Sequence, residues 1–120
     1  RGMVFVFDYP ASQAALARCI ERGGVTVADR FELYLDGVEI ANGYRELLDA
    51  GELRRRAERD NGQRRGAGQA PRDPDPRLLA ALSAGLPDCS GVALGVDRLL
   101  MYLRGARRVE EVLPFDWRRC

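Results

Sequence analysis

The sequence predicts an α+β fold, with an antiparallel sheet and flanking helices. The first indication is the two-residue turn Asp36-Gly37 between two alternating segments, a strong signal for a β-hairpin. The second is that extended and helical segments do not alternate in the βαβ order that builds a parallel sheet. The length of 120 residues, with 46% hydrophobic and 31% charged residues, suits a single domain with a modest core.

The N-terminal third is predicted to be mostly extended. Residues 3–9 are β-branched and aromatic and predict a strand that ends at Pro10. Small apolar residues over 11–17 predict a short helical turn capped by Ser12. Residues 25–40 are predicted to be extended on both sides of the hairpin turn.

The hairpin turn also predicts a register. It places Leu35 opposite Val38, and the pairs that follow are Tyr34 with Glu39, Leu33 with Ile40, and Glu32 with Ala41. Because side chains alternate between faces, one face is predicted to pack on a core and the other to present carboxylates. The apolar face consists of Leu33, Leu35, Val38 and Ile40, and the other of Glu32, Tyr34 and Glu39.

The middle of the chain is predicted to hold two helices. Over residues 46–65 a thin apolar stripe with interleaved arginines and acids favours a solvated surface helix. A nucleic-acid patch is disfavoured there, because the charges are mixed and no aromatic residue intervenes. Residues 66–76 are a Gly- and Pro-rich loop, and Asp75-Pro76 opens a second helix over 77–84.

The C-terminal part is predicted to contain a glycine-spaced strand from Gly91, followed by a helix to about Leu103. A further strand is expected near residues 109–113, and the lone Trp117 is expected to pack against the domain. The apolar side of that helix is assigned to a core and not to a cofactor surface. The residues so assigned are Leu99, Leu100, Met101 and Leu103.

Composition excludes several kinds of chemistry. All 19 basic residues are arginine, so no lysine can form a Schiff base or serve a P-loop, and a net charge of +1 argues against a global field for nucleic acid. The absence of histidine excludes Ser-His-Asp and Cys-His catalysis within this chain, and imidazole-bound zinc.

The cysteines, the absence of long apolar runs and the start of the chain indicate the compartment and the extent of the protein. Cys19, Cys89 and Cys120 are scattered and odd in number, which fits a reducing, cytoplasmic protein without a disulfide framework. No apolar run approaches membrane-spanning length, so no membrane partner is expected. Because the chain opens at Arg1 with a strand directly after it, we expect a piece of a longer protein.

Two carboxylates seven residues apart, Glu39 and Glu46, form the first candidate site. Asn42 and Gly43 tolerate positive φ, so we expect a turn between the acids that brings both onto one cavity. Such a pair can hold Mg²⁺ together with substrate phosphates, or an ammonium group. A hairpin edge with solvated glutamates and a glycosidase-type acid pair remain alternatives, although no sugar cleft is indicated.

The strand-to-helix junction from Gly91 to Arg98 is the second candidate site. Helix N–H groups, the positive end of the helix dipole and a guanidinium in the first turn together suit a polyphosphate. The pattern is not G-x-G-x-x-G, because Ala93 takes the middle position and the third glycine is missing. The alternative is a strand whose glycines allow close helix packing, with Arg98 bridging to an acid. A nucleophilic Cys89 is disfavoured without a histidine base.

These motifs resemble the C-terminal part of the catalytic domain of class II lysyl-tRNA synthetases. The segments concerned are Arg30-Phe31-Glu32, Glu39-x-x-Asn42-Gly43-Tyr44-x-Glu46-Leu47 and Gly91-x-Ala93-x-Gly95-x-Asp97-Arg98, of which the last looks like motif 3. Within that family the chain is more similar to the elongation factor P lysine ligases, on Phe31-Glu32-Leu33-Tyr34, Pro10-Ala11-Ser12-Gln13-Ala14 and Pro87-Asp88-Cys89-Ser90. Lysyl-tRNA synthetases proper usually have glycine at the position of Ala93 and lack the Asp-Cys-Ser triplet.

The resemblance implies a role for each matching residue, with ATP and Mg²⁺ as the cofactors. On the nucleotide side, Glu39 and Ile40 would lie along ATP, Gly95 under the adenosine, and Arg98, the catalytic arginine, against the γ-phosphate. On the amino-acid side, Asn42 and Glu46 would hold the substrate, with Tyr44 stacked beside it. Glu39 and Glu46 would also bind Mg²⁺.

The implied activity is activation of lysine or (R)-β-lysine as an adenylate and its transfer to a lysine of elongation factor P. The alternatives are a fragment of a lysyl-tRNA synthetase that charges tRNA, and a non-catalytic paralogue. Residues 1–120 would be the C-terminal part of a catalytic domain that is a homodimer when full length. Motifs 1 and 2 are absent from this chain, so we expect these residues alone to be inactive, with sheet edges exposed.

Overall fold

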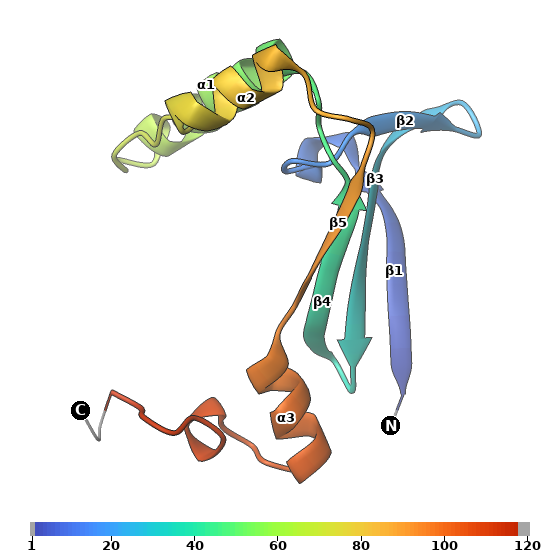
Figure 1. The fold of residues 1–120 in the computed structure, drawn as a ribbon, viewed down its shortest axis with the longest axis vertical. Coiled ribbons are helices and arrows are strands. Elements are labelled where there is room, and N and C mark those ends of the chain that lie inside the picture. Colours follow the sequence, from blue (N-terminus) through green and yellow to red (C-terminus); the bar gives the residue numbers. More distant parts are fainter. Residues whose placement is uncertain (1, 118–120) are drawn as a thin grey trace.

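The computed structural model describes residues 2–117 and has the predicted α+β architecture (Figure 1). The antiparallel strands run in the order β1-β3-β4-β5, with β2 paired to the first part of β3. They are β1 (Met3–Pro10), β2 (Cys19–Arg22), β3 (Val25–Leu35), β4 (Val38–Arg45) and β5 (Ser90–Leu94). The helices of the described part are α1 (Ala50–Gly66), α2 (Pro76–Ala84) and α3 (Val96–Arg104), with 3₁₀ turns η1 (Ala11–Gln13) and η2 (Val109–Glu111).

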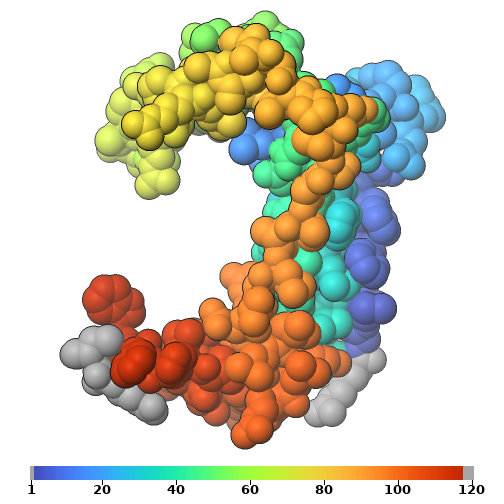
Figure 2. Space-filling model, in the orientation of Figure 1, coloured from blue at the N-terminus to red at the C-terminus, as the bar shows by residue number. Residues whose placement is uncertain are grey.

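The described residues form a crescent. In Figure 2 the sheet makes the back of the crescent, with α1 and α2 at one tip and α3 with the C-terminal segment at the other. The Cα radius of gyration is 17.6 Å, whereas a compact domain of this length has about 14 Å. An open shape of this kind leaves much of the sheet uncovered.

The hairpin follows the predicted register only next to its turn. Leu35 pairs with Val38 and Tyr34 with Glu39, as predicted. Beyond that point the register shifts by one residue, so that Leu33 faces Ala41 and Glu32 faces Asn42. The predicted pairs of Leu33 with Ile40 and of Glu32 with Ala41 are therefore wrong. The cause is a β-bulge in β4 in which Ile40 is the extra residue, a feature that turn chemistry does not encode.

No turn separates Asn42 from Gly43. Strand β4 continues through both residues to Arg45, and neither has a positive φ. The predicted bend is thus wrong. Gly43 instead provides space: a Cβ there would lie 2.6 Å from the Phe31 ring, which packs across it on the face away from Asn42.

The first helix begins later than predicted. Residues 46–49 are not helical, because Glu46 still bridges to Ala17 in the sheet region, and α1 starts at Ala50 with Asp49 as its cap. The Asp49 carboxylate accepts hydrogen bonds from the N–H groups of Gly51 and Glu52 (2.7 and 3.1 Å). The second helix is as predicted, with Asp75 as the cap and Pro76 at the first position.

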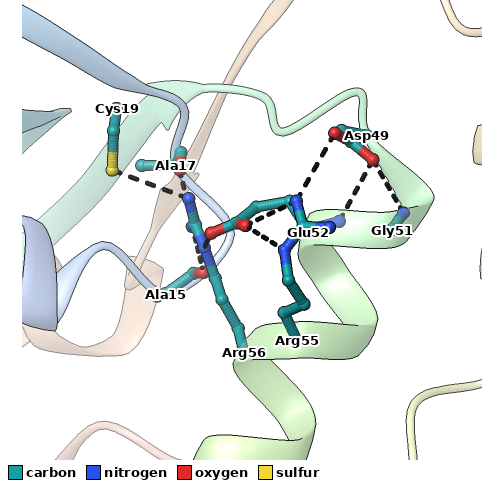
Figure 3. Close-up of polar contacts among 8 residues, drawn as sticks. All are labelled: Ala15, Ala17, Cys19, Asp49, Gly51, Glu52, Arg55 and Arg56. Carbon is teal, nitrogen blue, oxygen red and sulfur yellow. Dashed lines mark hydrogen bonds and ion pairs between the residues drawn. The ribbon is translucent and has the colours of Figure 1, made fainter.

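A buried arginine fastens α1 to the sheet (Figure 3). Arg56 is 7% exposed. Its guanidinium donates to the carbonyls of Ala15 (2.9 Å) and Ala17 (2.8 Å), to Sγ of Cys19 (3.6 Å) and to Glu52 (2.8 Å). The hydrogen bond from Arg56 is also the main reason why the pKa of Glu52 is lowered. One side chain therefore ties the helix to the segment between η1 and β2.

Three predictions for local structure are wrong. Ser12 does not cap η1, which begins after Pro10 without a side-chain cap. Residues 109–113 contain η2 and not a strand, since Glu111 accepts from the N–H groups of residues 107 and 108 and draws the chain into a turn. Trp117 is 97% exposed and packs against nothing in the described part of the chain.

Many of the large apolar side chains are exposed to solvent. The buried cluster is small and consists of Ala14, Ala17 and Ala28, with Tyr9, Cys19 and Tyr44 packed against it. Helix α3 buries none of its residues, so the predicted helix core is not formed within residues 2–117. One sheet face exposes large apolar side chains, namely Met3, Phe5, Phe7, Val92 and Leu94. A face of this kind favours packing against further polypeptide.

No helix of the described part has both the length and the apolarity that crossing a bilayer requires.

Loss of the hydrogen bonds of Arg56 to the segment before β2 is expected to destabilise the protein. An Arg56→Gln variant leaves the carbonyls of Ala15 and Ala17 without their buried donor, which costs about 1–3 kcal/mol of unfolding free energy. Urea denaturation measures the loss, with Arg59→Gln, an exposed residue of the same helix, as the matched control. Equal stability of the two variants would contradict this role for Arg56.

Candidate functional site

A groove of about 610 Å³ lies between β4 and the junction of β5 with α3. It is lined by all the residues that the sequence motifs led us to expect at the binding sites for the nucleotide and the amino acid. These are Glu39, Ile40, Asn42, Tyr44 and Glu46 from β4 and the residue after it, with Gly95 and Arg98 from the junction. The two constellations, separate in the sequence, thus form the two walls of one groove.

The bulge at Ile40 determines which side chains line the groove. In a regular strand, two residues seven apart point to opposite faces, so Glu39 and Glu46 would be divided by the sheet. The register shows otherwise: the β3 partners of Glu39, Asn42 and Tyr44 are residues 34, 32 and 30, which all share one face. Because the bulge adds one residue between Glu39 and Ala41, the alternation of side chains shifts by one. Glu39 therefore lies on the same face as Asn42, Tyr44 and Glu46. The acids were expected on one cavity; a bulge, and not a turn, places them there.

Small residues of β5 form the floor of the groove. Gly91 pairs with Tyr44, and Ala93 pairs with Asn42. A Cβ at Gly91 would lie 2.6 Å from Oε1 of Glu46, so the carboxylate occupies the space that glycine leaves open. At the far end, the Gly95 N–H donates to the Ile40 carbonyl (2.8 Å) and joins the junction to the bulge.

Arg98 extends from the first turn of α3 toward Glu39. Its Nη1 donates to the Glu39 carbonyl (3.1 Å) and lies 3.6 Å from the Glu39 carboxylate oxygen Oε2. The Arg98 side chain is 53% exposed, and it lines the groove. Helix α3 begins at Val96, and its N-cap residue, Gly95, provides no side-chain cap. This end of the groove therefore combines a helix N-terminus, an arginine and an acid.

The opposite end combines an acceptor, a phenol and an acid. Oδ1 of Asn42 is buried without a hydrogen-bond partner in the described residues. Burial, followed by the charge of Glu46, raises the pKa of Tyr44, which keeps its phenol neutral. A buried acceptor that lacks a donor, next to a carboxylate, suits a ligand that carries N–H groups.

A buried polar cluster next to the groove was not predicted as a site. Glu32, 7% exposed and opposite Asn42, accepts hydrogen bonds from Tyr9 (2.7 Å), Tyr34 and Arg30. Alternation along β3 indicates that Glu32 and Tyr34 share a face, but the approach of Tyr9 from β1 has no signal in the sequence. The cluster fixes β3 beside β4, on the same face of the sheet as the groove.

The donor set fits magnesium bound together with phosphates. No group of three or more His, Cys, Asp or Glu residues that could hold a metal occurs within residues 2–117. Mg²⁺ at a nucleotide site typically uses one or two carboxylates with phosphate oxygens and water. Glu39 and Glu46 share one face but lie at opposite ends of the groove, so each offers one carboxylate to an ion that is also bound by phosphates.

Comparison with known proteins agrees with the motifs. The family model described as tRNA synthetases class II (D, K and N) matches residues 1–118. The "Elongation factor P--(R)-beta-lysine ligase" of Proteus mirabilis (strain HI4320) is 56% identical over 111 residues, 92% of this chain and 34% of the relative. Proteins of the same name from Mannheimia succiniciproducens and Edwardsiella ictaluri are 56% and 54% identical over 110 and 113 residues, again 34% of each relative. The chain thus spans about a third of the length of these curated relatives.

The Glu32 cluster predicts a pH dependence of stability. The hydroxyls of Tyr34 and Tyr9, and then Arg30, hold the pKa of Glu32 below its ordinary value of 4.5. A lowered pKa stabilises the fold fully above that value, and the contribution is lost as the pH falls through the folded-state pKa. Glu32→Gln should therefore be less stable than the wild type at pH 7, and the gap should narrow toward pH 3. Denaturation curves across this range test it, and a gap that does not change with pH would contradict it.

Proposed function

The chain belongs to the class II tRNA synthetase family (D, K and N), and on this premise we propose that the whole protein is an ATP-dependent ligase for lysine or (R)-β-lysine. One observation carries the proposal: the bulge at Ile40 turns two acids and an asparagine toward the same groove as Arg98. The groups that would bind phosphate lie at one end of that groove, and the groups that would bind an amine lie at the other.

The amine end would select the substrate. The Glu46 carboxylate offers the charge for an ammonium group, and the unpartnered Oδ1 of Asn42 accepts one of its N–H groups. The neutral ring of Tyr44 would cover the aliphatic part of the side chain. Together the three groups favour a cationic, flexible amino acid over an acidic one.

The phosphate end would hold the nucleotide. Glu39 and Ile40 would lie along ATP with Gly95 beneath the adenosine, and Arg98 would move from Glu39 to the γ-phosphate. Glu39 and Glu46 would hold Mg²⁺, which when bound neutralises phosphate charge. Arg98 would act in the same sense, because its guanidinium, once on the γ-phosphate, would stabilise the negative charge that grows on the leaving pyrophosphate.

The proposed chemistry has two steps. A carboxylate oxygen of the amino acid attacks the α-phosphorus of ATP; a new O–P bond forms and the bond to pyrophosphate breaks. An amine of the acceptor then attacks the acyl carbon of the adenylate, which releases AMP and a proton. The chain's residues orient the ends of both substrates, so the reacting carboxylate and phosphorus meet at the middle of the groove.

The acceptor is inferred from the relatives. Proteins 50–56% identical to this chain bear the name elongation factor P--(R)-beta-lysine ligase, so we propose a lysine of elongation factor P as acceptor. The second candidate is a lysyl-tRNA synthetase that charges tRNA, which the same family model covers. The Asp-Cys-Ser triplet before Gly91 favours the first. We further propose a cytoplasmic homodimer for the whole protein, in which the strands of this chain are only part of the catalytic domain.

Arg98 is expected to be essential for activation. Arg98→Ala should lower lysine-dependent pyrophosphate exchange by the whole protein about 10²–10³-fold, because a charge stabiliser of the transition state is lost. Arg104→Ala, an exposed arginine at the other end of the same helix, is the control and should be unaffected. Exchange that survives in the Arg98 variant at the wild-type rate would refute the proposed role.

Ala93 is expected to influence the choice of amino acid. It faces Asn42 on the groove floor, and its methyl group narrows the amine end relative to glycine. Ala93→Gly should shift kcat/KM from (R)-β-lysine toward α-lysine by about 10-fold or more, within the range that one methyl group in a pocket provides. Pyrophosphate exchange with each amino acid measures the ratio, and an unchanged ratio would exclude this role.

A further inference from the structure

Three segments that are distant in the sequence meet at Glu46. The Glu46 N–H donates to the carbonyl of Cys89 (3.0 Å), and Glu46 forms a β-bridge to Ala17 on its other side. The flanking Arg18 N–H donates to the Arg45 carbonyl (2.8 Å), and Leu47 donates to residue 16 (2.8 Å). The backbone of Glu46 is therefore held between two other segments.

The carboxylate of Asp88 joins the same three segments through side chains. It accepts hydrogen bonds from Nε (2.9 Å) and Nη2 of Arg45, and lies 3.5 Å from Nη1 of Arg18. Each of these three charged residues is the sequence neighbour of a residue in the backbone contacts described above. Arg18 follows Ala17, Arg45 precedes Glu46, and Asp88 precedes Cys89. Because Arg45 and Glu46 are neighbours in an extended segment, their side chains leave on opposite sides. The ion pairs thus lie behind the groove and not in it.

The Asp88–Arg45 ion pair contributes more to the orientation of the two side chains than to the stability of the fold. Asp88 and Arg45 are 51% and 39% exposed, and exposed ion pairs contribute little to global stability. The two-pronged contact of a guanidinium with a carboxylate, however, fixes their relative orientation. Residues 85–89 form neither helix nor strand, so the approach to β5 depends on the contacts of Asp88 and Cys89.

The position of β5 in turn sets the space around Glu46. Its carboxylate oxygen occupies the space above Gly91, where even a methyl group would come within 2.6 Å. A shift of the β5 start would therefore displace this carboxylate relative to Asn42 and Tyr44. The charged form of Asp88 is favoured, since Arg45 lowers its pKa.

We propose that Asp88 is a positioning residue: by bridging Arg45 and Arg18 it fixes the start of β5 under Glu46 and so sets the site for the substrate's amine. This inference rests on the proposed function, in which Glu46 binds that amine. It gives the Asp-Cys-Ser triplet a physical role, because aspartate, and not cysteine, makes the bridging contact.

The test compares Asp88→Ala, Asp88→Asn and Asp88→Glu in the whole protein by pyrophosphate exchange. The Ala and Asn variants should raise KM for the amino acid about three- to fivefold, the range for loss of an exposed ion pair, with KM for ATP and kcat little changed. Asp88→Glu should recover part of the loss. Arg45→Ala should match Asp88→Ala, and the double variant should be no worse than either. Asp8→Asn, which breaks the exposed ion pair with Arg22 (3.2 Å), is the matched control and should not change KM.

Two results would overturn the inference. One is an unchanged KM for the amino acid in Asp88→Ala; the other is an equal loss in kcat and both KM values with no recovery in Asp88→Glu, which indicates general damage. Crystal structures of the wild type and Asp88→Ala provide a test that does not need activity. Displacement of the Glu46 carboxylate from Gly91 supports the inference, and an unmoved carboxylate refutes it. Absence of lysine-dependent exchange in the wild type would instead refute the proposed function.

Discussion

The β3–β4 ladder shifts by one residue at Ile40, and the composition of the groove depends on this shift. Without it, Glu39 would point to the face that carries Phe31, and Arg98 would have no acid beside it on the groove side. A bulge bends the strand locally and increases its twist. Ile40 is 2% exposed, and its carbonyl accepts the Gly95 N–H, so the bulge also anchors the junction that carries Arg98. One backbone irregularity thus sets both walls of the site.

Each wall is supported from outside the groove. Next to the groove and on the same face, Glu32 of β3 accepts hydrogen bonds from three side chains, and because it is buried its carboxylate must keep them or leave polar groups unpaired. Behind β5, Asp88 bridges two arginines at the surface. Farther away, Arg56 holds the segment that contains Ala17, which pairs with Glu46. The apolar core is small, and it consists of Ala14, Ala17 and Ala28 with three side chains packed against it. Strand geometry at the site therefore depends on specific hydrogen bonds more than on packing.

Much of the fold followed from local chemistry. The Asp36-Gly37 turn, the Asp75-Pro76 helix start and the strand-to-helix junction at Gly95 were all predictable, since each depends on one or two residues with strong conformational preferences. The motifs also proposed the candidate site residues, and the structure brings these residues into one groove. The sequence could not reveal how the two acids reach one face, because a bulge arises from the match between two strands and from the contact of Ile40 with Gly95. Nor could it reveal the Glu32 cluster, which needs Tyr9 from a strand more than twenty residues away. Trp117 and the apolar side of α3 were assigned to a core that residues 2–117 do not form.

In the proposed mechanism, the acids of β4 and the arginine of α3 serve the two ends of a single bound pair of substrates. A crystal structure of the whole protein with lysine and a non-hydrolysable ATP analogue tests it most directly. We expect the substrate ammonium within hydrogen-bond distance of Glu46 and Asn42, and Arg98 on the phosphates, with the bulge at Ile40 unchanged. Ligands bound outside this groove, or Glu39 and Glu46 on opposite faces of β4, would contradict it.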